Sequence, residues 1–128
     1  MAKKKIISFL AVFISIVVLD LIFISTLILP IYQDSVSSTL KATPSITSSL
    51  LAWLLITLGI IYFVNPNSKN KKQSFKKGAL FGLIVYGVYS LTNYAIIQNW
   101  TIKMAIIDTI WGMILCGTLS VINKAISK

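Results

Sequence analysis

The sequence predicts an all-α membrane protein, an antiparallel bundle of four transmembrane helices with both termini in the cytoplasm. Of its 128 residues, 56% are hydrophobic, and the mean hydropathy is +0.86. The apolar residues gather in four runs of about 19 to 24 residues: 6–29, 46–64, 78–97 and 102–122. A helix rising about 1.5 Å per residue needs ~20 residues to cross ~30 Å of hydrocarbon. Because the runs and their short joints use up the chain, we expect a single membrane domain, 1–128.

The lysines predict the orientation. All twelve basic residues are lysines, and only Lys41 and Lys103 fall on one side of the predicted bundle. The other ten fall on the opposite side: Lys3, Lys4, Lys5, Lys69, Lys71, Lys72, Lys76, Lys77, Lys124 and Lys128. The positive-inside rule then places both termini in the cytoplasm of a bacterial inner membrane, with the lysines touching anionic lipid heads. The net charge of +9 does not indicate nucleic-acid binding, because the lysines flank spans and lack interleaved aromatic residues.

The first run is predicted to be a retained span. Lysines precede it, as in a signal peptide, but its apolar length exceeds the ~7–15 residues of a signal core and it contains Asp20. Pro30 is expected to end the helix, since proline has no N–H to donate to the preceding turn. Beyond it, Tyr32, Val36 and Leu40 recur every fourth residue, which predicts a short helix at the outer membrane surface.

Cap and turn signals set the bounds of the second span. Thr43 and Pro44 are typical of an N-cap followed by the first helical residue. The proline within Asn65–Asn67 is expected to end the span. The polar run 68–77 that follows is predicted to be a cytoplasmic loop.

The last two spans are predicted to pack as an antiparallel pair. The joint 98–101 is too short for any other arrangement, and its Trp100 is typical of an anchor at the membrane interface. Gly78 and Gly82 form a G-x-x-x-G step that lets a neighbouring helix approach closely, and Gly112 offers the same on the fourth span.

Asp20 and Asp108 lie deep inside apolar runs. A carboxyl near the centre of a membrane helix costs roughly 2.5–3.5 kcal/mol on insertion scales, so it usually faces protein or water and serves a purpose. With the predicted orientation, both acids fall in the outer half of the membrane, at the depth of Ser90 and Asn93. Successive side chains on a helix are turned by about 100°, so one side of the third span is predicted to face the two acids. This side comprises Gly78, Gly82, Val85, Tyr86, Tyr89, Thr92 and Asn93.

Each acid is followed one helical turn later by an aromatic residue, Phe23 or Trp111, which can screen it from lipid. No lysine lies at this depth, so we expect a protonated acid or one hydrogen-bonded to Asn93, Tyr86, Tyr89 or Trp111. The predicted polar cluster comprises Asp20, Tyr86, Tyr89, Ser90, Asn93, Asp108 and Trp111.

The stretch 86–95, Tyr-Gly-Val-Tyr-Ser-Leu-Thr-Asn-Tyr-Ala, followed by Trp100 and the Asp-Thr-Ile-Trp-Gly of 108–112, resembles the bacterial family called domain of unknown function 2177. The resemblance covers nearly the whole chain. It implies a four-helix inner-membrane protein and supplies no settled activity. The family pattern usually reads Tyr-Asp-Leu-Thr-Asn, whereas this chain has Ser90 in place of the acid. Either the chain is an altered member, or Asp20 and Asp108 carry the role and position 90 supports them.

Three functions remain open. The polar cluster could bind or transport a cation, a proton or a lipid head group, and a conduction path would need a homo-oligomer. The chain could instead be an accessory or scaffold subunit of a larger membrane partner. A lipid-modifying enzyme is the third alternative, with the two carboxyls as acid and base. The sequence favours a non-enzymatic role without a cofactor or metal, because His is absent, Cys116 stands alone and no nucleophile or cofactor motif is present.

Overall fold

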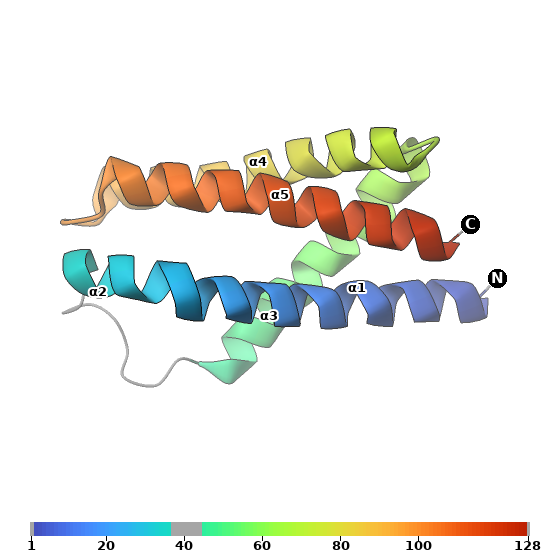
Figure 1. Cartoon of the computed structure of the whole chain (residues 1–128), viewed down its shortest axis with the longest axis horizontal. Helices are drawn as coiled ribbons and strands as arrows, with labels where there is room; N and C mark the ends of the chain where they lie inside the picture. The colour runs from blue at the N-terminus through green and yellow to red at the C-terminus, as the bar shows by residue number, and fades with distance from the viewer. Residues whose placement is uncertain (1, 37–44, 128) are drawn as a thin grey trace.

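Four long helices form a bundle, as the sequence predicts. The computed structural model describes residues 2–36 and 45–127, and no strand occurs within these ranges. Its four helical stretches long and apolar enough to cross a membrane are Lys3–Asp34, Ile46–Asn67, Lys71–Ile96 and Ile102–Ser127. Both ends of the chain lie at one end of the bundle, the terminal end, and the opposite end is called the distal end below (Figure 1).

The first span continues through Pro30, so the prediction that this proline ends the helix is wrong. The span consists of α1 (Ala2–Phe23), the π-helical turn η1 (Ile24–Ile28) and α2 (Leu29–Val36). The wide turn ends at Ile28, two residues before the proline, in the turn where Pro30 interrupts the regular pattern of backbone hydrogen bonds. Tyr32 therefore belongs to the transmembrane helix and not to a separate surface helix, while Leu40 lies outside the described residues.

The second span consists of three consecutive segments: α3 (Ile46–Gly59), the π-helical η3 (Ile60–Val64) and the 3₁₀ turn η4 (Asn65–Asn67). The proline-containing turn ends the span, as predicted. At the start, Ser45 is the N-cap, and its hydroxyl accepts from the Ser48 N–H at 3.3 Å. Thr43 and Pro44, the predicted start, lie outside the described residues.

The third span begins earlier than predicted. α4 (Lys71–Ile96) includes most of the expected 68–77 loop, because Asn70 caps it by accepting from the Gln73 N–H at 2.8 Å. The turn to α5 (Ile102–Ser127) is as short as expected, and its Asn99 adopts a left-handed conformation at φ 71°. α5 extends past the predicted end at position 122.

α4 and α5 pack at backbone contact. A Cβ at Gly82 would overlap the Gly112 carbonyl, and one at Gly78 would overlap Cys116 and Ser120. The Ser74 hydroxyl adds a buried hydrogen bond to the Ser120 carbonyl at 3.0 Å. The predicted close approach at these glycines is therefore present between these two helices.

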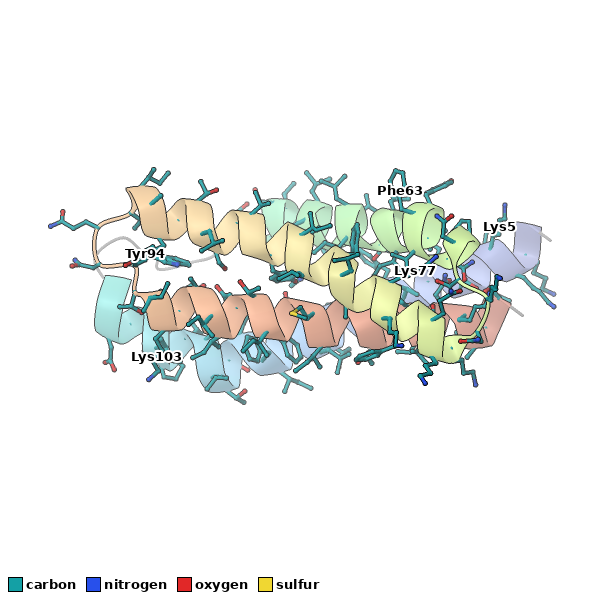
Figure 2. All side chains as sticks on the ribbon, turned by 90° about the horizontal axis from the view of Figure 1, so that it is seen from above. Lys5, Phe63, Lys77, Tyr94 and Lys103 are labelled. Carbon is teal, nitrogen blue, oxygen red and sulfur yellow. The ribbon has the colours of Figure 1, made fainter. Side chains whose placement is uncertain are left out.

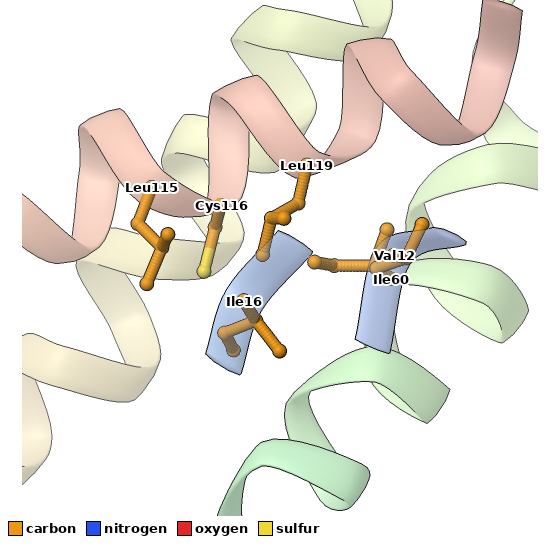
Figure 3. Close-up of a cluster of buried hydrophobic side chains, with 6 residues drawn as sticks. All are labelled: Val12, Ile16, Ile60, Leu115, Cys116 and Leu119. Atoms are coloured by element: carbon orange, nitrogen blue, oxygen red, sulfur yellow. The ribbon is translucent and has the colours of Figure 1, made fainter. Parts of the chain in front are cut away.

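α1 and α3 complete the bundle around α5. α1 packs along α5, while α3 crosses behind α1 at a steep angle (Figure 1). Only the end segment η3 of the second span packs closely on both α4 and α5. The terminal half is filled by a cluster of buried side chains (Figure 3): Val12, Ile16, Ile60, Leu115, Cys116 and Leu119.

The described lysines segregate along the bundle. Lys5 and Lys77 lie toward the terminal end, and Lys103 lies at the distal end, as does Tyr94 (Figure 2). Lys124 donates to the Ser68 carbonyl at 2.6 Å, which ties the end of α5 to the α3–α4 connection. The positive-inside rule places the lysine-rich end of a membrane protein in the cytoplasm. The cytoplasmic placement of the termini therefore stays a prediction.

Candidate functional site

A cavity of about 610 Å³ lies in the distal half of the bundle. Residues of the first span, α3, α4 and α5 line it together. Aliphatic side chains form much of the lining. Its polar and aromatic members are Asp20, Phe23, Tyr32, Ser49, Trp53, Tyr86, Tyr89, Asp108 and Trp111. Both intramembrane acids therefore open onto the same space.

Asp20 is held by two indoles. The Nε1–H of Trp53 donates to one carboxyl oxygen at 2.8 Å, and the Nε1–H of Trp111 donates to the other at 3.0 Å. The carboxyl belongs to α1 and its donors to α3 and α5, so these bonds join three helices. Phe23 stacks on Trp111 with ring centroids 4.2 Å apart and an interplanar angle of 11°. The stack fixes the indole in the position from which it donates.

Asp108 is held by a single hydroxyl. Tyr32 of α2 donates to Oδ2, and no other described side chain donates to the carboxyl. Tyr32 in turn packs edge-on against Trp100 with centroids 5.0 Å apart. Asp108 is only 7% exposed, so its second oxygen can meet a ligand only from within the bundle.

Of the predicted third-span residues, two tyrosines reach the cavity. Tyr86 lies over Gly112, because a Cβ there would overlap the phenol ring. Tyr89 lines the cavity and meets Trp100 edge-on at 6.2 Å. Trp100 is buried against these rings, so it closes the distal end of the packed core.

Ser90 and Asn93 do not line the cavity. Ser90 is 0% exposed, and its hydroxyl has no hydrogen-bond partner among the described residues. The α4–α5 register, in which Gly82 meets Gly112, places Ser90 two turns further on, opposite Met104 and Asp108. Position 90 therefore lies behind the Asp108 side of the cavity.

The structure brings together five of the seven predicted cluster residues: Asp20, Tyr86, Tyr89, Asp108 and Trp111. Trp111 donates to Asp20 and not to the acid one turn before it on its own helix. Sequence reasoning missed Trp53 and Tyr32. An indole inside a membrane span commonly finds an acceptor for its N–H, which is a signal in the sequence for Trp53, although the buried indole of Trp100 has no partner among the described residues. Tyr32 was missed because the first span was predicted to end at Pro30, two residues before it.

The donor set limits the chemistry available to the cavity. Within the described ranges, no three His, Cys, Asp or Glu side chains lie close enough to hold a metal ion. The cavity offers carboxyl acceptors, phenols and aromatic faces, and none of its lining residues is a lysine. Such a lining favours a positively charged or hydrogen-bond-donating ligand.

A bundle of four helices long and apolar enough to cross a membrane, with two acids on one cavity between them, is typical of an integral membrane protein. The chain belongs to the DUF2177 family, described as predicted membrane protein, whose model matches residues 5–125. The expected family membership is thereby confirmed. No curated protein and no solved structure matches the chain.

Proposed function

We propose that this protein binds a small cationic molecule in its intramembrane cavity, with Asp108 as the direct contact. The observation that carries the proposal is that two carboxyls, Asp20 and Asp108, line one cavity that has no lysine in its wall. Asp20 already accepts two indole N–H bonds, whereas Asp108 accepts one hydroxyl and keeps an oxygen available. A cation is the ligand that carboxyl oxygens attract most strongly.

Electrostatics supports a useful affinity. Two opposite unit charges about 4 Å apart attract by roughly 4 kcal/mol at an effective dielectric constant of ~20. A cation over an aromatic face gains a further ~0.5–2 kcal/mol, and Trp53, Tyr86 and Trp111 provide such faces. The second oxygen of Asp108 is the acceptor that remains available, since Tyr32 occupies only the first.

Binding is favoured over free conduction. The cavity occupies the distal half, while the terminal half is filled by the side-chain cluster around Ile16 and Leu119 and by the α4–α5 glycine contacts. A cation that enters from the distal half therefore meets a closed core. Transport would need a second conformation in which this core opens.

The test is a titration of the purified protein in phosphatidylcholine nanodiscs with tetramethylammonium chloride, against sodium chloride at equal ionic strength. Trp53 and Trp111 lie in the cavity wall, so their fluorescence reports occupancy. We expect saturable binding that weakens at least about tenfold, or ~1.4 kcal/mol, in Asp108→Asn. The matched control is Asp34→Asn, since Asp34 is the third acid of the chain and does not line the cavity.

The control variant should bind like the wild type. A wild-type response equal to that of Asp108→Asn would refute cation binding. Reproducible co-purification of a larger membrane protein, combined with no cation response, would favour the accessory-subunit alternative instead.

A further inference from the structure

The cavity is much larger than a simple cation requires. Its volume of about 610 Å³ equals that of roughly 20 water molecules at ~30 Å³ each. Most of the wall is apolar: Ile24 and Ile28 of the first span, Leu55 and Ile56 of α3, and Val85 of α4 contribute to it. A hydrated inorganic ion would leave this apolar surface in contact with water, at a cost that an organic ligand avoids.

The rim of the cavity lies where lipid is expected. Leu55 is a lining residue and yet 67% exposed, and it lies near the middle of its span, Ile46–Asn67. Across the cavity, Tyr89 of α4 is 53% exposed. α3 crosses at an angle and packs on α4 mainly through η3 at the terminal end, so the two helices diverge around the cavity (Figure 1). The cavity therefore opens sideways, at the depth of the hydrocarbon.

The wall also excludes one common class of amphiphile. A phospholipid head group carries a phosphate, which needs positive charge or a set of N–H donors. The lining contains no lysine, and the chain has no arginine. The two indole N–H groups of the wall are already bonded to Asp20. A phosphate would thus face two carboxyls, with neutral hydroxyls such as those of Tyr86 and Tyr89 as its donors and no positive charge to compensate it.

We infer that the ligand is an amphipathic ammonium compound, an alkyl chain ending in a cationic nitrogen and carrying no anionic group. The nitrogen lies at the Asp108 carboxyl beside the Tyr86 ring, and the chain passes along Leu55 through the side opening into the lipid. This inference rests on the proposed function and adds the apolar tail, the lateral route and the exclusion of phosphate.

The experiment compares three probes in phosphatidylcholine nanodiscs: a bromo-terminated undecyltrimethylammonium, the corresponding bromo-terminated alcohol, and tetramethylammonium. Bromine quenches tryptophan at short range, and the Trp100→Phe background leaves only the two cavity indoles. We expect saturable quenching by the tailed cation, with an apparent affinity at least about tenfold above that of tetramethylammonium. The alcohol should quench weakly and without saturation, and Asp108→Asn should remove the saturable component.

The outcomes separate the two proposals. Equal affinities for the tailed and the small cation would overturn the amphiphile inference and leave cation binding intact. Equal quenching by the alcohol and the tailed cation, unchanged in Asp108→Asn, would overturn both. Replacing part of the phosphatidylcholine by a phosphate-free, uncharged glycolipid should leave the affinity for the tailed cation unchanged. Tighter binding would show that choline head groups, each an ammonium joined to a phosphate, had been competing, which would refute the exclusion of phosphate.

Discussion

The glycine contacts between α4 and α5 give a sharp prediction. In Gly82→Ala, the new Cβ would overlap the backbone carbonyl of Gly112, which cannot rotate away as a flexible side chain could. The two helices must therefore move apart, and overpacking of this kind typically costs about 1–3 kcal/mol. The displacement also loosens the contact of Tyr86 with Gly112, on which one wall of the cavity depends.

Gly87→Ala is the matched control on the same helix. Its Cβ would meet only Thr109 and Leu83 atoms, at 3.8 and 3.9 Å, which is ordinary van der Waals contact. Alanine also favours the helix by up to ~1 kcal/mol over glycine, so this variant should be as stable as the wild type or more stable.

The assay is unfolding of both variants in a mixed detergent series, followed by tryptophan fluorescence and by retention on size exclusion. We expect Gly82→Ala to unfold at lower denaturing-detergent fractions than Gly87→Ala. Equal stability of the two alanine variants would refute the argument that the α4–α5 approach at Gly82 limits the packing.

Three further predictions concern the acids and the topology. Asp20→Asn should destabilise the protein more than Asp108→Asn in the same assay. An amide has one acceptor oxygen for the two indole donors at position 20, whereas the hydroxyl of Tyr32 can still donate to an amide oxygen at position 108. The reverse order of stability would contradict the hydrogen-bond assignment. Tyr32→Phe should cost about 1–2 kcal/mol, since it leaves a buried carboxyl without its donor; unchanged stability would show that this bond does not contribute. In a Cys116→Ala background, a membrane-impermeant maleimide applied from outside should label Gln98→Cys and not Asn70→Cys; the opposite pattern would invert the predicted orientation.

The hydrophobic runs and the glycines predicted the fold well, because span length and close helix approach depend on local sequence. Gly82 and Gly112 each predict a close helix approach from their own span, and in the structure they contact each other. Helix ends were less predictable. Pro30 follows a π-helical turn that widens the backbone, and nothing in its immediate residues signals that turn.

The site was predictable only in part. The cost of burying a carboxyl identifies Asp20 and Asp108 from sequence alone. Their partners depend on which helices become neighbours: Trp53 and Trp111 reach Asp20 from two other spans, and Tyr32 reaches Asp108 from the far end of the first. Such pairings follow from tertiary packing, which the periodicity of a single helix does not encode.

The bonds to Asp20 also have a consequence for synthesis at the ribosome. The carboxyl is made early, Trp53 follows 33 residues later and Trp111 follows 91 residues later. At ~5–20 residues per second, the interval before the second donor emerges is roughly 5–18 s. During that interval the newly inserted first span carries an acid without its full set of donors. The translocon and early lipid contacts must therefore tolerate one acid in an otherwise apolar helix until the last span arrives to complete the site.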